Sequence, residues 1–216
     1  MQYCEQLLST GHFEPWNALS NVAFLFAALL SWLAARRQRL SVTPAASLLM
    51  LLAVTIGAGS FAWHATHAPW AELADVLPIL SFVLVFLYVG VRAAASRRHA
   101  AVACGVMVTA IGGLIAGMPH ELNGSLAYLP VLIGLAGLAI SLPKPATKRL
   151  LRAATAVFTA SLTARTFDLA LCADYPHGSH WLWHVGNGVV IYLAIKATLE
   201  MFSGNVPQPR NGTVSK

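Results

Sequence analysis

Charged residues are scarce in this 216-residue sequence: only 10% of positions carry a charge, whereas soluble domains have about 25%. The sequence is 57% hydrophobic and has a mean hydropathy of +0.64, which is typical of a polytopic membrane protein. It also lacks a polar stretch long enough for a soluble domain, so we expect one membrane domain over residues 1–202. The segment 203–216 is polar and rich in Pro, Gly and Asn, which predicts a disordered cytoplasmic tail.

Residues 1–17 lack the basic n-region of a signal peptide, so we expect no cleaved leader. Crossing a hydrocarbon core of about 30 Å takes about 20 mostly apolar residues. The segments that satisfy this condition cover roughly 18–35, 45–63, 73–92, 100–117, 126–142, 150–167 and 181–202. The segment that contains Arg152 and Arg165 is the weakest of them. The predicted fold class is therefore all-α, a bundle of seven transmembrane helices.

One face of this predicted bundle carries a single acidic residue, Glu200. Of the 14 basic residues, 13 fall on that same face, which the positive-inside rule makes cytoplasmic. The N-terminus is then outside and the C-terminus is cytoplasmic. We interpret the net charge of +6 as a topology signal, and it does not predict a nucleic-acid partner.

Two histidines, His180 and His184, begin the last apolar segment at a spacing of four residues. On a helix these positions share one face, so both imidazoles can bind a single ion. The same spacing also occurs where histidines cap a helix or lie in an interfacial belt, here with Trp181 and Trp183. Other residues must decide between these interpretations.

The predicted topology brings further groups to the same outer end of the bundle. The second segment runs outward and ends at His64, with Ser60 one turn earlier, and the third runs inward from about Asp75. Three histidines with one open position are the usual ligand set of catalytic zinc. We therefore predict a zinc site at His64, His180 and His184 in the outer leaflet.

A carboxylate among apolar residues at membrane depth is costly and marks a functional site by default, and Asp75 is such a group. An interfacial helix cap is the alternative for this residue. Beside zinc, Asp75 is placed to accept a proton from the attacking water, and Ser60 to donate a hydrogen bond to an oxyanion. The predicted chemistry is metal-assisted hydrolysis of an amphiphile whose acyl chain occupies the bundle.

The first 21 residues are rich in polar groups, among them Glu5 and Glu14. They predict either a solvated helix start or a cap over the outer mouth of the bundle. In the second case the carboxylates bind a hard cation or hydrogen-bond to other loops. Cys4 and Cys172 both fall on the external side, where disulfides persist, and could pair, whereas Cys104 lies inside a span.

A series of short motifs runs through the chain in a fixed order: Tyr3-Cys4-Glu5, Glu14-Pro15-Trp16-Asn17 with Ser20-Asn21, Gly59-Ser60 through His64, Asp75 with Leu77-Pro78, Asp168 with Cys172, and His180 through His184. Together these motifs resemble the alkaline ceramidases of the CREST superfamily of membrane hydrolases. The resemblance implies a seven-helix zinc amidase within the membrane that cleaves ceramide to sphingosine and a fatty acid.

Carried over position by position, the resemblance makes His64, His180 and His184 the zinc ligands and Asp75 the residue on the zinc water. It also makes Ser60 the oxyanion partner and pairs Cys4 with Cys172 in a disulfide. Eukaryotic relatives also bind calcium through an Asp-Trp-x-Glu-x-Asn run and a later Glu. Here Glu5 and Glu14 match, but Gln2, Tyr3 and Leu7 stand at the Asp, Trp and Asn positions, which argues against calcium at this second cation site.

Short loops and Ala/Leu-rich spans suggest a bacterial inner-membrane member with its site near the periplasmic face. Because many bacteria lack ceramide, another long-chain amide or ester is an alternative substrate. Two other classes stay open. One is a receptor-like relative, similar to the progestin and adipoQ receptors, that keeps the zinc site without significant turnover. The other is a membrane electron carrier that uses His64 and a histidine of the last segment as axial haem ligands.

Overall fold

The computed structural model describes residues 2–8 and 13–203, and in these ranges the chain is helical and contains no strand. The long helices are α3 (Val22–Arg37), α4 (Pro44–Thr66), α5 (Pro69–Ala94), α6 (Arg97–Gly117), α7 (Leu129–Ser141), α8 (Pro145–Phe167) and α9 (His180–Phe202). Short helices complete the architecture: α1 (Cys4–Leu8), α2 (Pro15–Ser20) and the 3₁₀ turns η1 (Glu121–Tyr128) and η2 (Leu169–Leu171). Beyond Ser203, the predicted tail lies outside the described residues.

Prolines and a hydroxyl side chain define where several of these helices begin. The helices α2, α4, α5 and α8 each start with proline, whose missing N–H is no loss in the first turn. Thr43 precedes α4, and its side-chain oxygen accepts a hydrogen bond from the backbone N–H of Ala46 at 3.2 Å. The start of α4 is therefore fixed locally, which sets the register of the residues at its other end.

Six helical stretches of the described chain are long and apolar enough to cross a membrane: Pro15–Arg37, Pro44–Thr66, Pro69–Ala94, Arg97–Gly117, Glu121–Ser141 and His180–Phe202. The helix α8 has a suitable length of 23 residues but carries Lys148, Arg149, Arg152 and Arg165. The predicted apolar segments are thus all helical, whereas α8 as a seventh span stays a prediction. The protein is an all-helical membrane protein.

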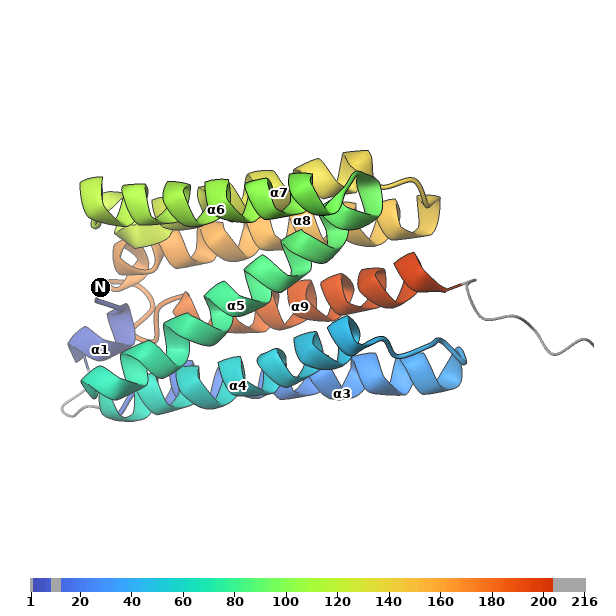
Figure 1. Cartoon of the computed structure of the whole chain (residues 1–216). Coiled ribbons are helices and arrows are strands. Elements are labelled where there is room, and N and C mark those ends of the chain that lie inside the picture. The colour runs from blue at the N-terminus through green and yellow to red at the C-terminus, as the bar shows by residue number, and fades with distance from the viewer. Residues whose placement is uncertain (1, 9–12, 204–216) are drawn as a thin grey trace, which may run out of the picture.

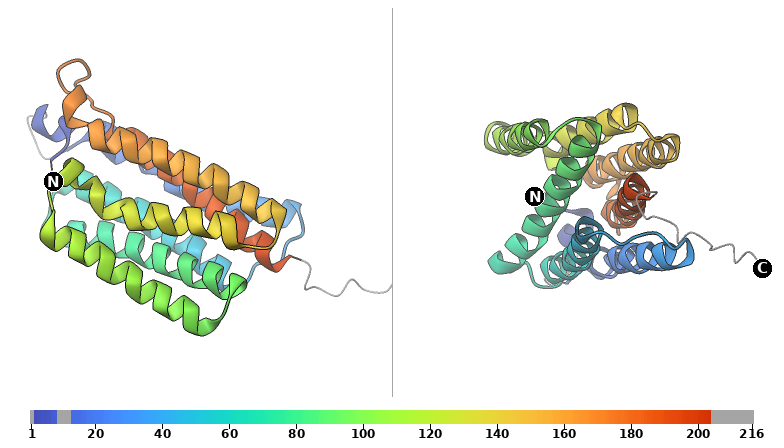
Figure 2. Two further views of the ribbon diagram at one scale, coloured as in Figure 1. Left: turned by 90° about the horizontal axis from the view of Figure 1, so that it is seen from above. Right: turned by 45° about the vertical axis from the view of Figure 1, so that its right-hand side comes forward.

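The last helix, α9, lies in the interior of the bundle and packs against α3, α4, α5 and α8 (Figure 2). Its apolar residues Val190, Ile191 and Ala194 are buried. Gly188 allows a close approach to α3, because a Cβ at this position would lie 2.8 Å from the Cβ of Ala23. Within a membrane such contacts stabilise the bundle through close packing rather than through exclusion of water.

The N-terminal segment covers the end of the bundle at which α4 ends and α9 begins (Figure 1). A disulfide between Cys4 and Cys172 ties α1 to the stretch that follows η2, with the two Cα atoms 5.4 Å apart. The carboxylate of Glu5 accepts hydrogen bonds from the backbone N–H groups of Trp16 and Asn17, each at 2.8 Å, at the start of α2. The segment is therefore a folded cap, the second of the two arrangements expected from the sequence.

Candidate metal centre

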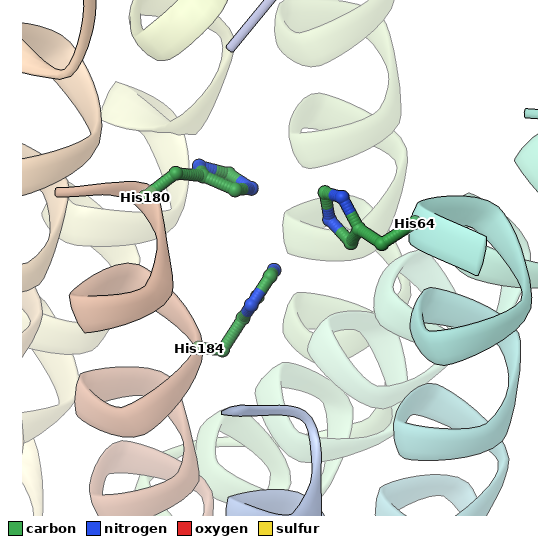
Figure 3. A group of neighbouring side chains, drawn as sticks. All are labelled: His64, His180 and His184. Atoms are coloured by element: carbon green, nitrogen blue, oxygen red, sulfur yellow. The ribbon is translucent and has the colours of Figure 1, made fainter. Parts of the chain in front are cut away.

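Three buried histidines from two helices meet beneath this cap. His64 lies in the last turn of α4, and His180 and His184 occupy the first two turns of α9. One nitrogen of each ring can be chosen so that all three lie within 4.8 Å of one another. Figure 3 shows the three imidazoles turned toward a common point between the two helices. The structure thus brings together the three residues predicted as metal ligands.

The proton on His184 is fixed by Ser20, the last residue of α2. The Ser20 hydroxyl donates to the backbone oxygen of Asn17 at 2.9 Å, so its single proton is already used. The same hydroxyl oxygen lies 2.7 Å from Nδ1 of His184 and must accept its hydrogen bond. Nδ1 therefore carries the proton, which leaves Nε2 of His184 bare and able to bind a metal.

His64 is fixed in the same way by Glu14. Nδ1 of His64 lies 3.0 Å from Oε2 of Glu14, and this carboxylate has no exposed surface. Burial alone would raise the pKa of Glu14, but hydrogen bonds from His64, Asn17 and His67 bring this pKa below its ordinary value. An ionised carboxylate only accepts hydrogen bonds, so Nδ1 of His64 carries the proton and Nε2 is left for a metal.

The third histidine, His180, is held by its backbone and by stacking. Its N–H donates to Oδ1 of Asp168 at 2.8 Å, and the same carboxylate accepts from the backbone N–H groups of Cys4 and Ser179. The ring of Tyr3 stacks on the imidazole with centroids 3.6 Å apart. Burial raises the pKa of Tyr3 to about 12, against the opposing effect of Arg165, so the phenol stays neutral at physiological pH.

Asp75 and Ser60 lie beside the histidines because α4 and α5 touch at the preceding residues. Gly59 packs directly against the backbone carbonyl of Ala74, and an added Cβ would overlap that carbonyl. Ser60 and Asp75, the next residue on each helix, form a side-chain hydrogen bond. Asp75 lies inside α5, six residues after its first residue, so it is not the helix cap that the sequence also allowed.

One carboxylate oxygen of Asp75, Oδ1, is buried and has no hydrogen-bond partner among the described residues. Buried carboxylate oxygens in native proteins almost always accept a hydrogen bond, from protein or from water. Asp75 lines the same cavity as His180 and His184. A water or another molecule in this cavity can supply the missing donor.

This cavity has a volume of about 110 Å³ and changes character along its length. Ser60, Asp75, His180 and His184 form its polar end, and the remaining lining is largely apolar: Ile79, Phe82, Phe86, Leu87, Met107, Leu135, Leu138, Ile191 and Ala194. At a rise of ~1.5 Å per residue, the lining along α9 from His180 to Ala194 spans roughly 20 Å. The cavity is shaped for a molecule with one polar group and a long apolar chain.

Arg165 is a site residue that the sequence did not predict. Its guanidinium is buried, lines the cavity and donates hydrogen bonds to the backbone oxygen of Asn123 at 2.7 Å and to Ser125 at 2.9 Å. It also lies over the rings of Tyr128 and Trp183, at 5.2 and 5.7 Å from their centroids. A charge in an otherwise apolar segment is the signal that marks such a residue.

Glu5 and Glu14, the predicted second cation site, are both engaged in hydrogen bonds. The two oxygens of Glu5 accept from α2, and those of Glu14 accept from Asn17, His64 and His67. All four carboxylate oxygens therefore have donors from the protein itself. The hydrogen bonds favour a structural role for both residues, and a cation site here stays a prediction from the sequence.

A family model described as Ceramidase matches residues 1–210, which is nearly the whole chain. No curated protein matches the sequence significantly. The matched range contains the three histidines, Ser60, Asp75 and both cysteines of the disulfide.

Proposed function

We propose that this chain, which belongs to the ceramidase family, is a zinc-dependent hydrolase of ceramide or a similar long-chain lipid amide. The products are a free fatty acid and an amino-lipid. The observation that carries the proposal is the meeting of His64, His180 and His184 at the polar end of a long apolar cavity.

The donor set fits zinc. Hydrogen bonds to Glu14 and Ser20 leave a bare Nε2 on His64 and His184, and His180 adds a third imidazole. Catalytic zinc takes three protein ligands at ~2.0–2.1 Å and keeps one position open. When bound, the ion would bring the pKa of a coordinated water near 7 and polarise an amide carbonyl.

Asp75 is the proposed proton carrier. Its Oδ1 lacks a partner among the described residues and is available to accept the proton of a water that attacks the amide carbon. The same proton can then pass to the leaving nitrogen as the C–N bond breaks, which yields a neutral amine. This use of one residue as base and then acid needs the carboxylate to remain within reach of both groups, and a position in the cavity wall provides that.

Ser60 is the proposed partner of the oxyanion. In the resting site its hydroxyl shares a hydrogen bond with Asp75. Once Asp75 has taken up a proton, its attraction for that hydroxyl falls, and Ser60 can donate to the negative charge that develops on the carbonyl oxygen. The two residues thus act in sequence, which their positions on touching turns of α4 and α5 permit.

The distribution of charge supports an orientation for the bundle. Basic residues such as Arg36, Arg97 and Lys148 lie at helix ends opposite the site, and the positive-inside rule makes that face cytoplasmic. The metal centre then lies near the external face, which in a bacterial inner membrane is the periplasmic one. A lipid amide reaches such a site with its polar group at the membrane surface and its acyl chain in the bundle.

The test is metal analysis of the purified protein beside hydrolysis of long-chain lipid amides. We expect near-stoichiometric zinc in the wild type, and the loss of both zinc and turnover in His184→Ala. His120→Ala is the matched control, because His120 is an exposed histidine that precedes η1 outside the site. Retained turnover in a metal-free His184→Ala protein would contradict the mechanism.

The same experiment separates the remaining alternatives. Zinc without turnover on any lipid amide or ester would favour the receptor-like class. A Soret band in the purified protein would indicate the haem carrier, a class that the family match does not support.

A further inference from the structure

His67, which ends α4 three residues after His64, adopts an unusual backbone conformation. Its φ is 50° and its ψ is 24°, in the left-handed region. Its N–H donates to the backbone oxygen of Trp63 at 2.8 Å, as is usual where a helix ends. Glycine is the common residue at this position, because any Cβ there meets the backbone. Arg39, after the end of α3, also has a positive φ, so the conformation by itself does not assign a role to the imidazole.

The ring of His67 is held by a buried acid. Its Nε2 forms a short hydrogen bond to Oε1 of Glu14, and the indole of Trp63 lies beside the ring with centroids 5.2 Å apart. The side chain of His67 is 12% exposed, whereas that of Glu14 is fully buried. His67 is thus the most exposed of the three side chains that hydrogen-bond to Glu14.

Glu14 in turn contacts His64 at two points. Its Oε2 binds the proton on Nδ1 of His64, and its backbone N–H donates to the backbone oxygen of His64 at 3.0 Å. The side chain and the backbone of one residue thus fix both the ring and the end of α4. Because Glu14 lies in the N-terminal cap, the segment before the first span sets the orientation of a helix-borne imidazole.

We propose that His67 is a positioning residue of the metal centre: it holds Glu14 in the orientation that fixes the ring of His64. The inference rests on the proposed function, because the ring of His64 needs such control only if it binds a metal. Substitution of a residue that hydrogen-bonds to a metal ligand commonly changes metal affinity by about 10–100-fold. His67 contacts such a residue, Glu14, rather than the ligand itself. We therefore expect an effect of about tenfold, at the lower end of that range.

The alternative is that His67 only ends the helix, and substitution by glycine separates the two roles. Glycine adopts the left-handed conformation without a Cβ penalty, so His67→Gly keeps or improves the helix end while it removes the imidazole. If His67 only ends α4, the glycine variant loses no metal affinity. A positioning residue is replaced at a loss of metal affinity, which a side chain that restores the donor to Glu14 recovers.

The experiment uses the full chain, purified in detergent, stripped of metal and titrated with zinc against a colorimetric chelator. We expect His67→Gly to bind zinc about tenfold more weakly than the wild type. His67→Gln carries an amide donor at the reach of Nε2 and should recover most of the affinity. His120→Gln is the control and should match the wild type.

Each outcome decides between the roles. Equal zinc affinity in wild type and His67→Gly would overturn the inference and leave the proposed function intact. Zinc affinity of His67→Gln as low as that of His67→Gly would also overturn it, because a donor to Glu14 would then not control the affinity. Absence of zinc binding by the wild type would instead overturn the proposed function, and the inference with it.

Discussion

Glycine has opposite roles in two regions of the molecule, which are the α4–α5 contact and the outer helix α6. Gly59 of α4 lies against the backbone of α5, so that no side chain fits between the two helices. Gly105, Gly112, Gly113 and Gly117 of α6 have nothing within 4 Å of an added Cβ. The helix α6 buries Ala100 and Met107 but otherwise faces outward. The glycine of α4 thus brings two backbones together where Ser60 must lie beside Asp75, whereas the glycines of α6 serve no such contact.

The largest effect is expected from Asp75→Asn at the α4–α5 contact. The amide can still accept the hydrogen bond from Ser60, so the contact is preserved, but it cannot take up a proton. Loss of a general base costs about 10²–10⁴-fold in rate, and we expect turnover of lipid amides to fall by this factor while zinc is retained.

Glu121→Gln is the matched control, since Glu121 is an exposed acid at the start of η1 and outside the site. It should change turnover little. Full activity in Asp75→Asn would show that the carboxylate does not carry the proton.

A smaller effect is expected from Gly59→Ala, which adds a methyl group between α4 and α5. Overpacking of this kind typically costs about 1–3 kcal/mol, and the shift also separates Ser60 from Asp75. We expect a lower unfolding temperature together with reduced turnover. An unchanged protein would mean that the helices yield at this contact without disturbing the site.

The smallest effect is expected from Gly113→Ala on α6, the control for the previous change. Its added methyl group meets no atom, and alanine favours a helix over glycine by about 0.5–1 kcal/mol. Unfolding should therefore occur at the same or a slightly higher temperature, with turnover unchanged. Destabilisation would instead indicate that another chain packs on this face.

Hydropathy alone predicted the helices, because about 20 apolar residues in a row have few other structures open to them in a membrane. Spacing and topology together placed His64, His180, His184 and Asp75 at one end of the bundle, and the structure brings these residues together. The helix α8 was the weakest segment in the sequence for the same reason that it fails as a candidate span: it carries four basic side chains.

The groups that fix the imidazoles could not be predicted in the same way. Ser20 reaches His184 across 164 positions and Glu14 reaches His64 across 50, so the pairs exist only once the cap has folded over the bundle. His67 gave no signal, because a single histidine after a helix is a common feature of loops. Arg165 had a signal, a charge after the uncharged residues 153–164 of α8, but its hydrogen-bond partners Asn123 and Ser125 lie far off in the sequence, in the η1 turn.

The central claim is that imidazoles from α4 and α9 hold one zinc ion. X-ray absorption at the zinc edge of the purified wild-type protein tests it most directly, because it reports the ligands of the bound metal. The account predicts three imidazole nitrogens and one oxygen at ~2.0–2.1 Å. A spectrum dominated by sulfur ligands, or one without imidazole scattering, would contradict it.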